Sequence, residues 1–180
     1  EKHDSDFTVG ITAAYDPASD TRYLLGLRRE RGLLPSQVQD LIREEVGRFG
    51  PVFCAVENNN FGKLHELGLR ATEVGRVLVP HHTGRQKADL YQGVPGLVSV
   101  LENGKWRLPY GDEYSRFMVR QLMAEFIGLG KEKHDDIVMA IWIFECLVRR
   151  FKLHLDNVGA YADSGGDGDI ERLDIEEERA

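Results

Sequence analysis

Strand-forming residues make up two runs near the start of the chain. Phe7–Tyr15 and Thr21–Arg29 are rich in Thr, Val, Ile, Leu and aromatic residues, and the turn-forming residues 16–20, Asp-Pro-Ala-Ser-Asp, lie between them. Two strand patterns on either side of such a turn predict a β-hairpin.

A helical pattern follows the predicted hairpin. Ser36 and Gln39 have the spacing of a capping box, and Gly50-Pro51 is typical of a helix end, with glycine at the C′ position. Between these signals, apolar residues recur at helical intervals at Val38, Leu41, Ile42 and Phe49. A helix is therefore predicted between Ser36 and Gly50.

The rest of the chain alternates strand and helix patterns. The wholly apolar run Val52–Val56 is typical of a strand buried on both faces. The further predicted elements are a short helix at 62–68, a strand at Val77–Val79, a polar loop at His81–Arg85, an interrupted helix at Ala88–Leu101, an edge strand at Trp106–Leu108, and helices at Asp112–Ile127 and His134–Leu153. This order predicts an α/β fold with a mixed sheet flanked by helices.

Length and charge limit the domain organisation and the classes of function that the chain could have. The 180 residues fit one domain, which we assign to residues 1–155; Asp, Glu and Gly dominate 156–180, an acidic tail predicted to be disordered. The formal net charge of -7 argues against a generally basic nucleic-acid binder, although much of the acid lies in the tail. No apolar run has the length of a membrane span and no secretory signal is recognisable, so we expect neither membrane insertion nor secretion.

An acidic pair, Asp135 and Asp136, directly precedes Ile137–Val148, the most apolar stretch of the chain. Two interpretations are open. Asp in the first turn of a helix caps free N–H groups and complements the helix dipole. Carboxylates fixed at the start of a rigid core helix are also suited to bind Mg²⁺ or Mn²⁺, which take oxygen ligands.

Glu57 directly follows the predicted buried strand Val52–Val56. Such a residue is often only the first solvated one, but ligand sites also collect beyond the carboxyl ends of strands in sheets covered by helices. If the last helix packs across the sheet, Glu57, Asp135 and Asp136 converge on one edge. Three carboxylates there predict a two-metal site for phosphodiester hydrolysis, with one ion activating water and the other stabilising the leaving oxygen.

Three segments, taken together, resemble a known family. Val56–Gly62, Thr83–Asp89 and Lys133–Ala140 are similar, in order and spacing, to the C-terminal nuclease domain of the terminase large subunits of tailed phages and archaeal viruses. The resemblance covers residues 4–150. It implies a ribonuclease H-like fold and a divalent-metal endonuclease that cleaves double-stranded viral DNA concatemers during genome packaging. It also implies that Glu57, Asp136 and Asp135 hold the metals.

The resemblance implies partners as well. These are double-stranded DNA, the ATPase domain of the same motor, the portal and the small terminase subunit, in the cytoplasm of an infected host cell. No Gly-x-x-x-x-Gly-Lys-Ser/Thr phosphate loop is present, so we expect no ATP site in this chain. Arg85 and Lys87 would either neutralise DNA phosphates or be plain surface charge. Asn58 and Asn59 would either contact the substrate backbone or form a turn.

The sequence departs from the family pattern at its beginning, where the first strand carries a catalytic Asp. Asp6 and the strand after it match the loop Asp and second strand of the family, which would place the first strand upstream of Glu1. Asp6 would then be a further metal ligand, or a solvated residue near a chain end. Two other alignments put Asp16 or Thr12 at the catalytic position; we favour the upstream strand.

Two rival functions follow from these observations. A chain without one of the metal-bridging carboxylates would bind at least one ion more weakly and would act as a catalytically silent module that docks onto DNA or packaging partners. The chain would instead be another ribonuclease H-like nuclease, of the resolvase or transposase type, if no ATPase precedes it.

Overall fold

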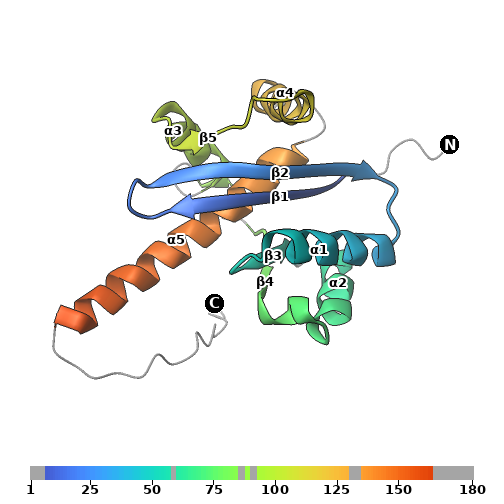
Figure 1. Cartoon of the computed structure of the whole chain (residues 1–180), viewed down its shortest axis with the longest axis horizontal. Coiled ribbons are helices and arrows are strands. Elements are labelled where there is room, and N and C mark those ends of the chain that lie inside the picture. Colours follow the sequence, from blue (N-terminus) through green and yellow to red (C-terminus); the bar gives the residue numbers. More distant parts are fainter. Residues whose placement is uncertain (1–6, 58–59, 85–87, 90–92, 130–134, 164–180) are drawn as a thin grey trace.

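The chain forms two small sheets with helices packed around them (Figure 1). The computed structural model describes residues 7–57, 60–84, 88–89, 93–129 and 135–163, and only the backbone of 60–64 and 154–163. The predicted mixed α/β architecture, a mixed sheet with flanking helices, is confirmed. No helix in the described part of the chain is long and apolar enough to cross a membrane.

The predicted hairpin is confirmed and forms the larger sheet. Strands β1 (Phe7–Asp16) and β2 (Thr21–Arg31) pair antiparallel, and the short strand β5 (Trp106–Arg107) adds to β2 in parallel. The order in this sheet is β1-β2-β5, so β1 lies at an edge.

A β-bulge in β2 determines which residues of the hairpin face the core. Thr12 pairs with Gly26 and Ala13 pairs with Leu24, so Leu25 is an extra residue in β2. Side chains of a regular strand alternate between faces, and one extra residue shifts that alternation. As a result Leu24 and Leu27, which lie on either side of the bulge, both pack into the same core.

The smaller sheet consists of β3 (Cys54–Glu57) and β4 (Leu78–His81), which pair in parallel. Both strands end later than predicted, so Glu57 is the last strand residue and His81 lies in a strand, not in a loop. The prediction that the apolar run is buried on both faces is wrong, because every residue of β3 is only half-buried. In the described part of the chain β3 pairs with β4 alone, which leaves its other edge open.

Helix α1 (Pro35–Phe49) begins one residue earlier than its predicted cap. Leu34 is the N-cap, Pro35 occupies the first turn, and the backbone N–H of Leu34 donates to the side-chain Oε1 of Gln37 at 2.8 Å. The predicted capping box of Ser36 with Gln39 is therefore wrong. The predicted helix end is confirmed, since Gly50 adopts a left-handed conformation with φ 55°.

The remaining helices surround the two sheets. They are α2 (Asn60–Arg70), η1 (Glu73–Arg76), η3 (Val94–Gly96), α3 (Leu97–Glu102), α4 (Glu113–Gly128) and α5 (Asp136–Asp163). In Figure 1, α3, α4 and β5 lie on one side of the hairpin, and α1, α2, β3 and β4 lie on the other. Asp112 caps α4 by accepting a hydrogen bond from the backbone N–H of Ser115.

Helix α5 connects the two sheets. It packs against β1 and also against β3, and it crosses behind the hairpin in Figure 1. Its first turns supply four fully buried core side chains, those of Ile137, Val138, Ile141 and Trp142. The helix continues to Asp163, so the domain boundary that the sequence placed at residue 156 falls inside it. Residues 164–180 of the predicted tail lie outside the described residues.

Candidate functional site

The carboxyl ends of β3 and β4 bring Glu57 and His81 side by side. The two residues are register partners in the parallel pair, and register partners on neighbouring strands project from the same face of the sheet. Thr83, just beyond β4, donates a hydrogen bond from its hydroxyl to Oε1 of Glu57. A carboxylate, an imidazole and a hydroxyl therefore meet at one corner of the smaller sheet.

His81 is buried against α5. His81 is only 3% exposed. Its ring meets the ring of Trp142 edge to face, with the ring centroids 5.3 Å apart and the ring planes at 80°. Burial lowers the pKa of His81, and the positive charge of Arg150 adds to that effect, while Glu57 opposes it. The imidazole is therefore neutral at neutral pH, the form that coordinates metal ions.

Both ring nitrogens of His81 are buried from solvent. Neither Nδ1 nor Nε2 has a hydrogen-bond partner among the described residues. A buried polar group in that state costs about 1–3 kcal/mol, while an edge-to-face aromatic contact contributes about 0.5–1.5 kcal/mol. The contact with Trp142 therefore does not by itself account for a histidine at this position.

The acidic pair lies at the start of α5, as predicted. Asp135 is exposed and immediately precedes the helix, and its carbonyl accepts a hydrogen bond from the N–H of Met139 at 2.8 Å. Asp136 is half-buried and is the first helical residue. Trp142, which contacts His81, follows Asp136 by about 9 Å along the helix axis at 1.5 Å per residue.

A third acidic residue, Glu125 of α4, lies beside the helix start. One of its carboxylate oxygens accepts a hydrogen bond from the N–H of Ile137 at 2.7 Å, and the other lies 2.9 Å from the guanidinium of Arg29. Burial raises the pKa of Glu125, and the negative charge of Asp136 contributes in the same direction. Sequence reasoning missed Glu125, although its spacing from Met118 and Leu122 places it on the buried stripe of an amphipathic helix.

The predicted three-carboxylate metal site stays a prediction. Among the described residues, no three His, Cys, Asp or Glu side chains lie close enough together to hold one metal ion. Glu57 on β3 and the acidic pair on α5 thus do not form a three-ligand group there. The predicted site residues Asp6, Asn58, Asn59, Arg85 and Lys87 lie outside the described residues.

A second buried acid has a structural role. Glu145 of α5 forms an ion pair with Arg22 of β2, with both Nε and NH2 of the guanidinium donating at 3.0 Å. Trp106 Nε1 donates to the same carboxylate at 2.9 Å. Both carboxylate oxygens of Glu145 accept hydrogen bonds from protein side chains, and the charged side chains of Arg22 and Glu145 are about 95% buried, so this group joins β2 and β5 to α5.

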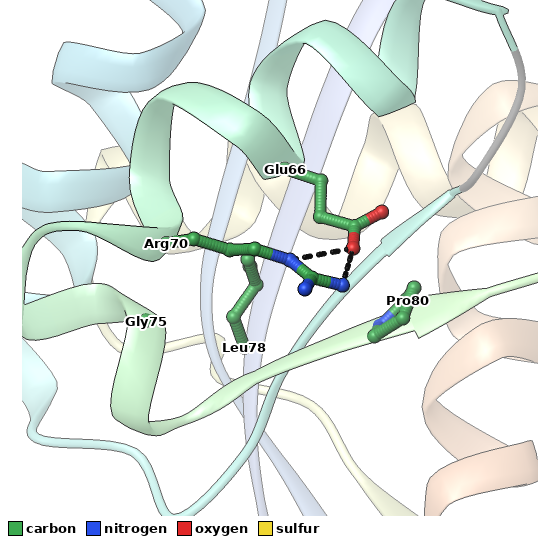
Figure 2. A pocket seen from close by; sticks show the side chains of 5 residues that line it. All are labelled: Glu66, Arg70, Gly75, Leu78 and Pro80. Atoms are coloured by element: carbon green, nitrogen blue, oxygen red, sulfur yellow. Dashed lines mark hydrogen bonds and ion pairs between the residues drawn. The ribbon is translucent and has the colours of Figure 1, made fainter. Parts of the chain in front are cut away.

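A shallow hollow of about 290 Å³ lies on the opposite face of the smaller sheet (Figure 2). Leu78 and Pro80 line it, and these residues alternate along β4 with Val79 and His81. Arg70 points across the hollow and donates two hydrogen bonds to one oxygen of Glu66, as the dashed lines show. The guanidinium is therefore already engaged, and the hollow is separate from the corner at Glu57.

Comparison of this chain with protein-family models, with curated proteins and with solved structures yields no match.

Proposed function

We propose that the chain is a metal-dependent endonuclease domain of ribonuclease H-like type, the nuclease part of a terminase large subunit. Its substrate would be double-stranded viral DNA, cut during genome packaging in the cytoplasm of the infected host cell. The motif order along the sequence supports this proposal, and so does the sheet with helices on its faces.

The observation that carries the proposal is the polar corner at the carboxyl ends of β3 and β4. Glu57 lies there next to His81 and receives a hydrogen bond from Thr83. A carboxylate beside an imidazole with unsatisfied nitrogens fits a divalent metal ion, because both groups are metal ligands. Asp136, on the helix that packs against β3, would supply a further carboxylate.

The residues of this chain would hold and orient the site. Thr83 fixes the rotamer of Glu57 through the hydroxyl hydrogen bond, and the buried first turns of α5 keep Asp135 and Asp136 on a rigid support. Bound Mg²⁺ or Mn²⁺ would supply activated water and stabilise the charge on the leaving oxygen.

The strand that the resemblance implies would find unpaired strand edges in this fold. In the described part of the chain β1 pairs only with β2 and β3 pairs only with β4, so each offers one open edge. Helix α5 covers both β1 and β3. A strand between them would join the two sheets into one, bury the apolar residues of β3, and bring its carboxylate to the corner at Glu57.

A second function is favoured by the incomplete ligand set. Since no three potential ligands gather among the described residues, the chain would by itself be a silent module that docks onto DNA, the ATPase domain, the portal or the small terminase subunit. The open edges of β1 and β3 suit such docking, because exposed strand edges pair readily with further strands.

Nicking of supercoiled plasmid with Mn²⁺ tests both functions. We expect weak or no cleavage by the chain of residues 1–180 and clear cleavage by a version extended upstream. In the extended version Glu57→Ala and Asp136→Ala should abolish cleavage, while Glu73→Ala, an exposed acid on η1, should not change it. Full activity in Glu57→Ala would refute the proposed site, and an inactive extended chain that still binds DNA would favour the docking module.

A further inference from the structure

His81 occupies a position that an apolar residue would fill at lower cost. Its side chain is buried in the contact with Trp142, yet both ring nitrogens lack a hydrogen-bond partner among the described residues. Buried polar atoms in this state indicate that something other than the described side chains completes their coordination. The orphaned nitrogens therefore point to a ligand.

Glu57 is the anionic residue that the strand register places beside His81. Neighbouring strands lie about 4.8 Å apart, and the two side chains leave the same face from register-paired positions. Bonds from Zn²⁺ to imidazole nitrogen and carboxylate oxygen are each about 2.0–2.2 Å long, so one such ion can lie between the two side chains. Thr83 orients Glu57 through its hydroxyl, which leaves the second carboxylate oxygen for the ion.

We propose that His81 and Glu57 bind the same divalent ion, and that this ion is a transition-series cation such as Mn²⁺ or Zn²⁺ rather than Mg²⁺. The inference rests on the metal site of the proposed function and adds a nitrogen ligand to it. Mg²⁺ takes oxygen ligands almost exclusively, whereas imidazole is a good ligand for Zn²⁺ and a weaker one for Mn²⁺. His81 therefore determines which metal the corner selects.

Direct metal binding tests the inference without any need for nuclease activity. Mn²⁺ is titrated into the chain of residues 1–180, and the free ion is followed by electron paramagnetic resonance. The variants are His81→Asn, Glu57→Gln and, as the matched control, His82→Asn, which alters the exposed neighbouring histidine. Circular dichroism shows that each variant is folded, and competition with Mg²⁺ measures the selectivity.

We expect His81→Asn and Glu57→Gln each to weaken Mn²⁺ binding at least about tenfold, and His82→Asn to leave it unchanged. His81→Asn should also reduce the preference for Mn²⁺ over Mg²⁺. If His81→Asn binds Mn²⁺ as the wild type does while Glu57→Gln does not, the role of His81 is wrong and the carboxylate site of the proposed function stands. If only His81→Asn weakens binding, the two residues share no ion. If the wild-type chain binds no Mn²⁺, the inference also fails.

A second measurement tests whether His81 binds the ion if His81→Asn does not fold. The imidazole nitrogens of the wild-type chain are observed by ¹⁵N magnetic resonance during titration with diamagnetic Zn²⁺. Coordination moves one nitrogen of His81 away from the positions of both neutral tautomers and leaves the His82 signals in place. An unchanged His81 spectrum at saturating Zn²⁺ overturns the inference.

Discussion

The carboxylate of Glu125 on α4 accepts a hydrogen bond from the backbone N–H of Ile137, in the first turn of α5, at 2.7 Å. A helix start leaves N–H groups without intrahelical partners, and here a different helix satisfies one of them. Capping of α5 therefore does not depend only on the two aspartates that precede Ile137.

Removing Glu125 should destabilise the fold. Glu125→Ala would leave the N–H of Ile137 without its acceptor and the charge of Arg29 without its carboxylate, in a site where Glu125 is only 4% exposed. Loss of one partner of a buried charge pair costs about 3–5 kcal/mol. Urea unfolding followed by circular dichroism measures the loss. Glu113→Ala, at an exposed position of the same helix, should cost about 1 kcal/mol or less.

Glu125 should also make stability depend on pH. Burial raises the pKa of this carboxyl in the folded state, so the folded protein holds the proton more tightly than the unfolded chain does. The contribution of Glu125 to the free energy of unfolding is therefore fully present below the pKa that this carboxyl has in the unfolded chain. It is lost as the pH rises through the pKa of the folded state. Thermal unfolding of wild type and Glu125→Gln across this range measures it. A difference between the two proteins that stays constant with pH would contradict the assignment.

The ion pair of Arg22 with Glu145 should behave as one unit. Glu145→Ala alone leaves the guanidinium of Arg22 buried without its main partner and should cost about 3–5 kcal/mol. Arg22→Met combined with Glu145→Leu replaces both charges by apolar groups and should cost less than the sum of Arg22→Met and Glu145→Leu made separately. A double-mutant cycle from denaturant unfolding gives the coupling. Additive single effects would show that the pair is not coupled.

Thr83 should act through Glu57. Thr83→Val removes the hydroxyl that donates to Glu57 and should weaken Mn²⁺ binding about tenfold or more, because groups that orient metal ligands contribute on this scale. Thr83→Ser, which keeps the hydroxyl, should restore binding. Thr72→Val is the matched control, since the Thr72 hydroxyl bonds to the carbonyl of Leu69 instead. Equal weakening in the Val and Ser variants would mean that packing, and not the hydrogen bond, is responsible.

Pairing of the open edges should be visible in amide hydrogen exchange. If an upstream strand lies between β1 and β3, amides on the open edges of both strands should become protected in the extended chain. Amides of β4 serve as the internal reference, because β4 is not adjacent to the proposed strand. Unchanged exchange in β1 and β3, in an extended chain that is folded, would place the added segment elsewhere.

Local patterns in the sequence were sufficient for most of the elements. The hairpin, α1, α4 and the start of α5 were predicted because apolar periodicity and turn residues act over a few neighbouring positions. Glu57 was placed at a strand end, and Asp135 and Asp136 at a helix start, for the same reason. Their joint role in metal binding remains a prediction.

Only the tertiary structure decided the features that depend on distant partners. The bulge at Leu25 lets Leu24 and Leu27 share one core face, although the strand period alone would put them on opposite faces. The extension of β4 to His81 depends on pairing with Glu57, which is distant in sequence. Burial of Glu125 against the start of α5 is likewise a contact between two helices. The sequence by itself determined which residues form strands and helices, because those preferences are local. Packing determined which side chains meet, because burial and hydrogen bonding between elements arise only once the chain has folded.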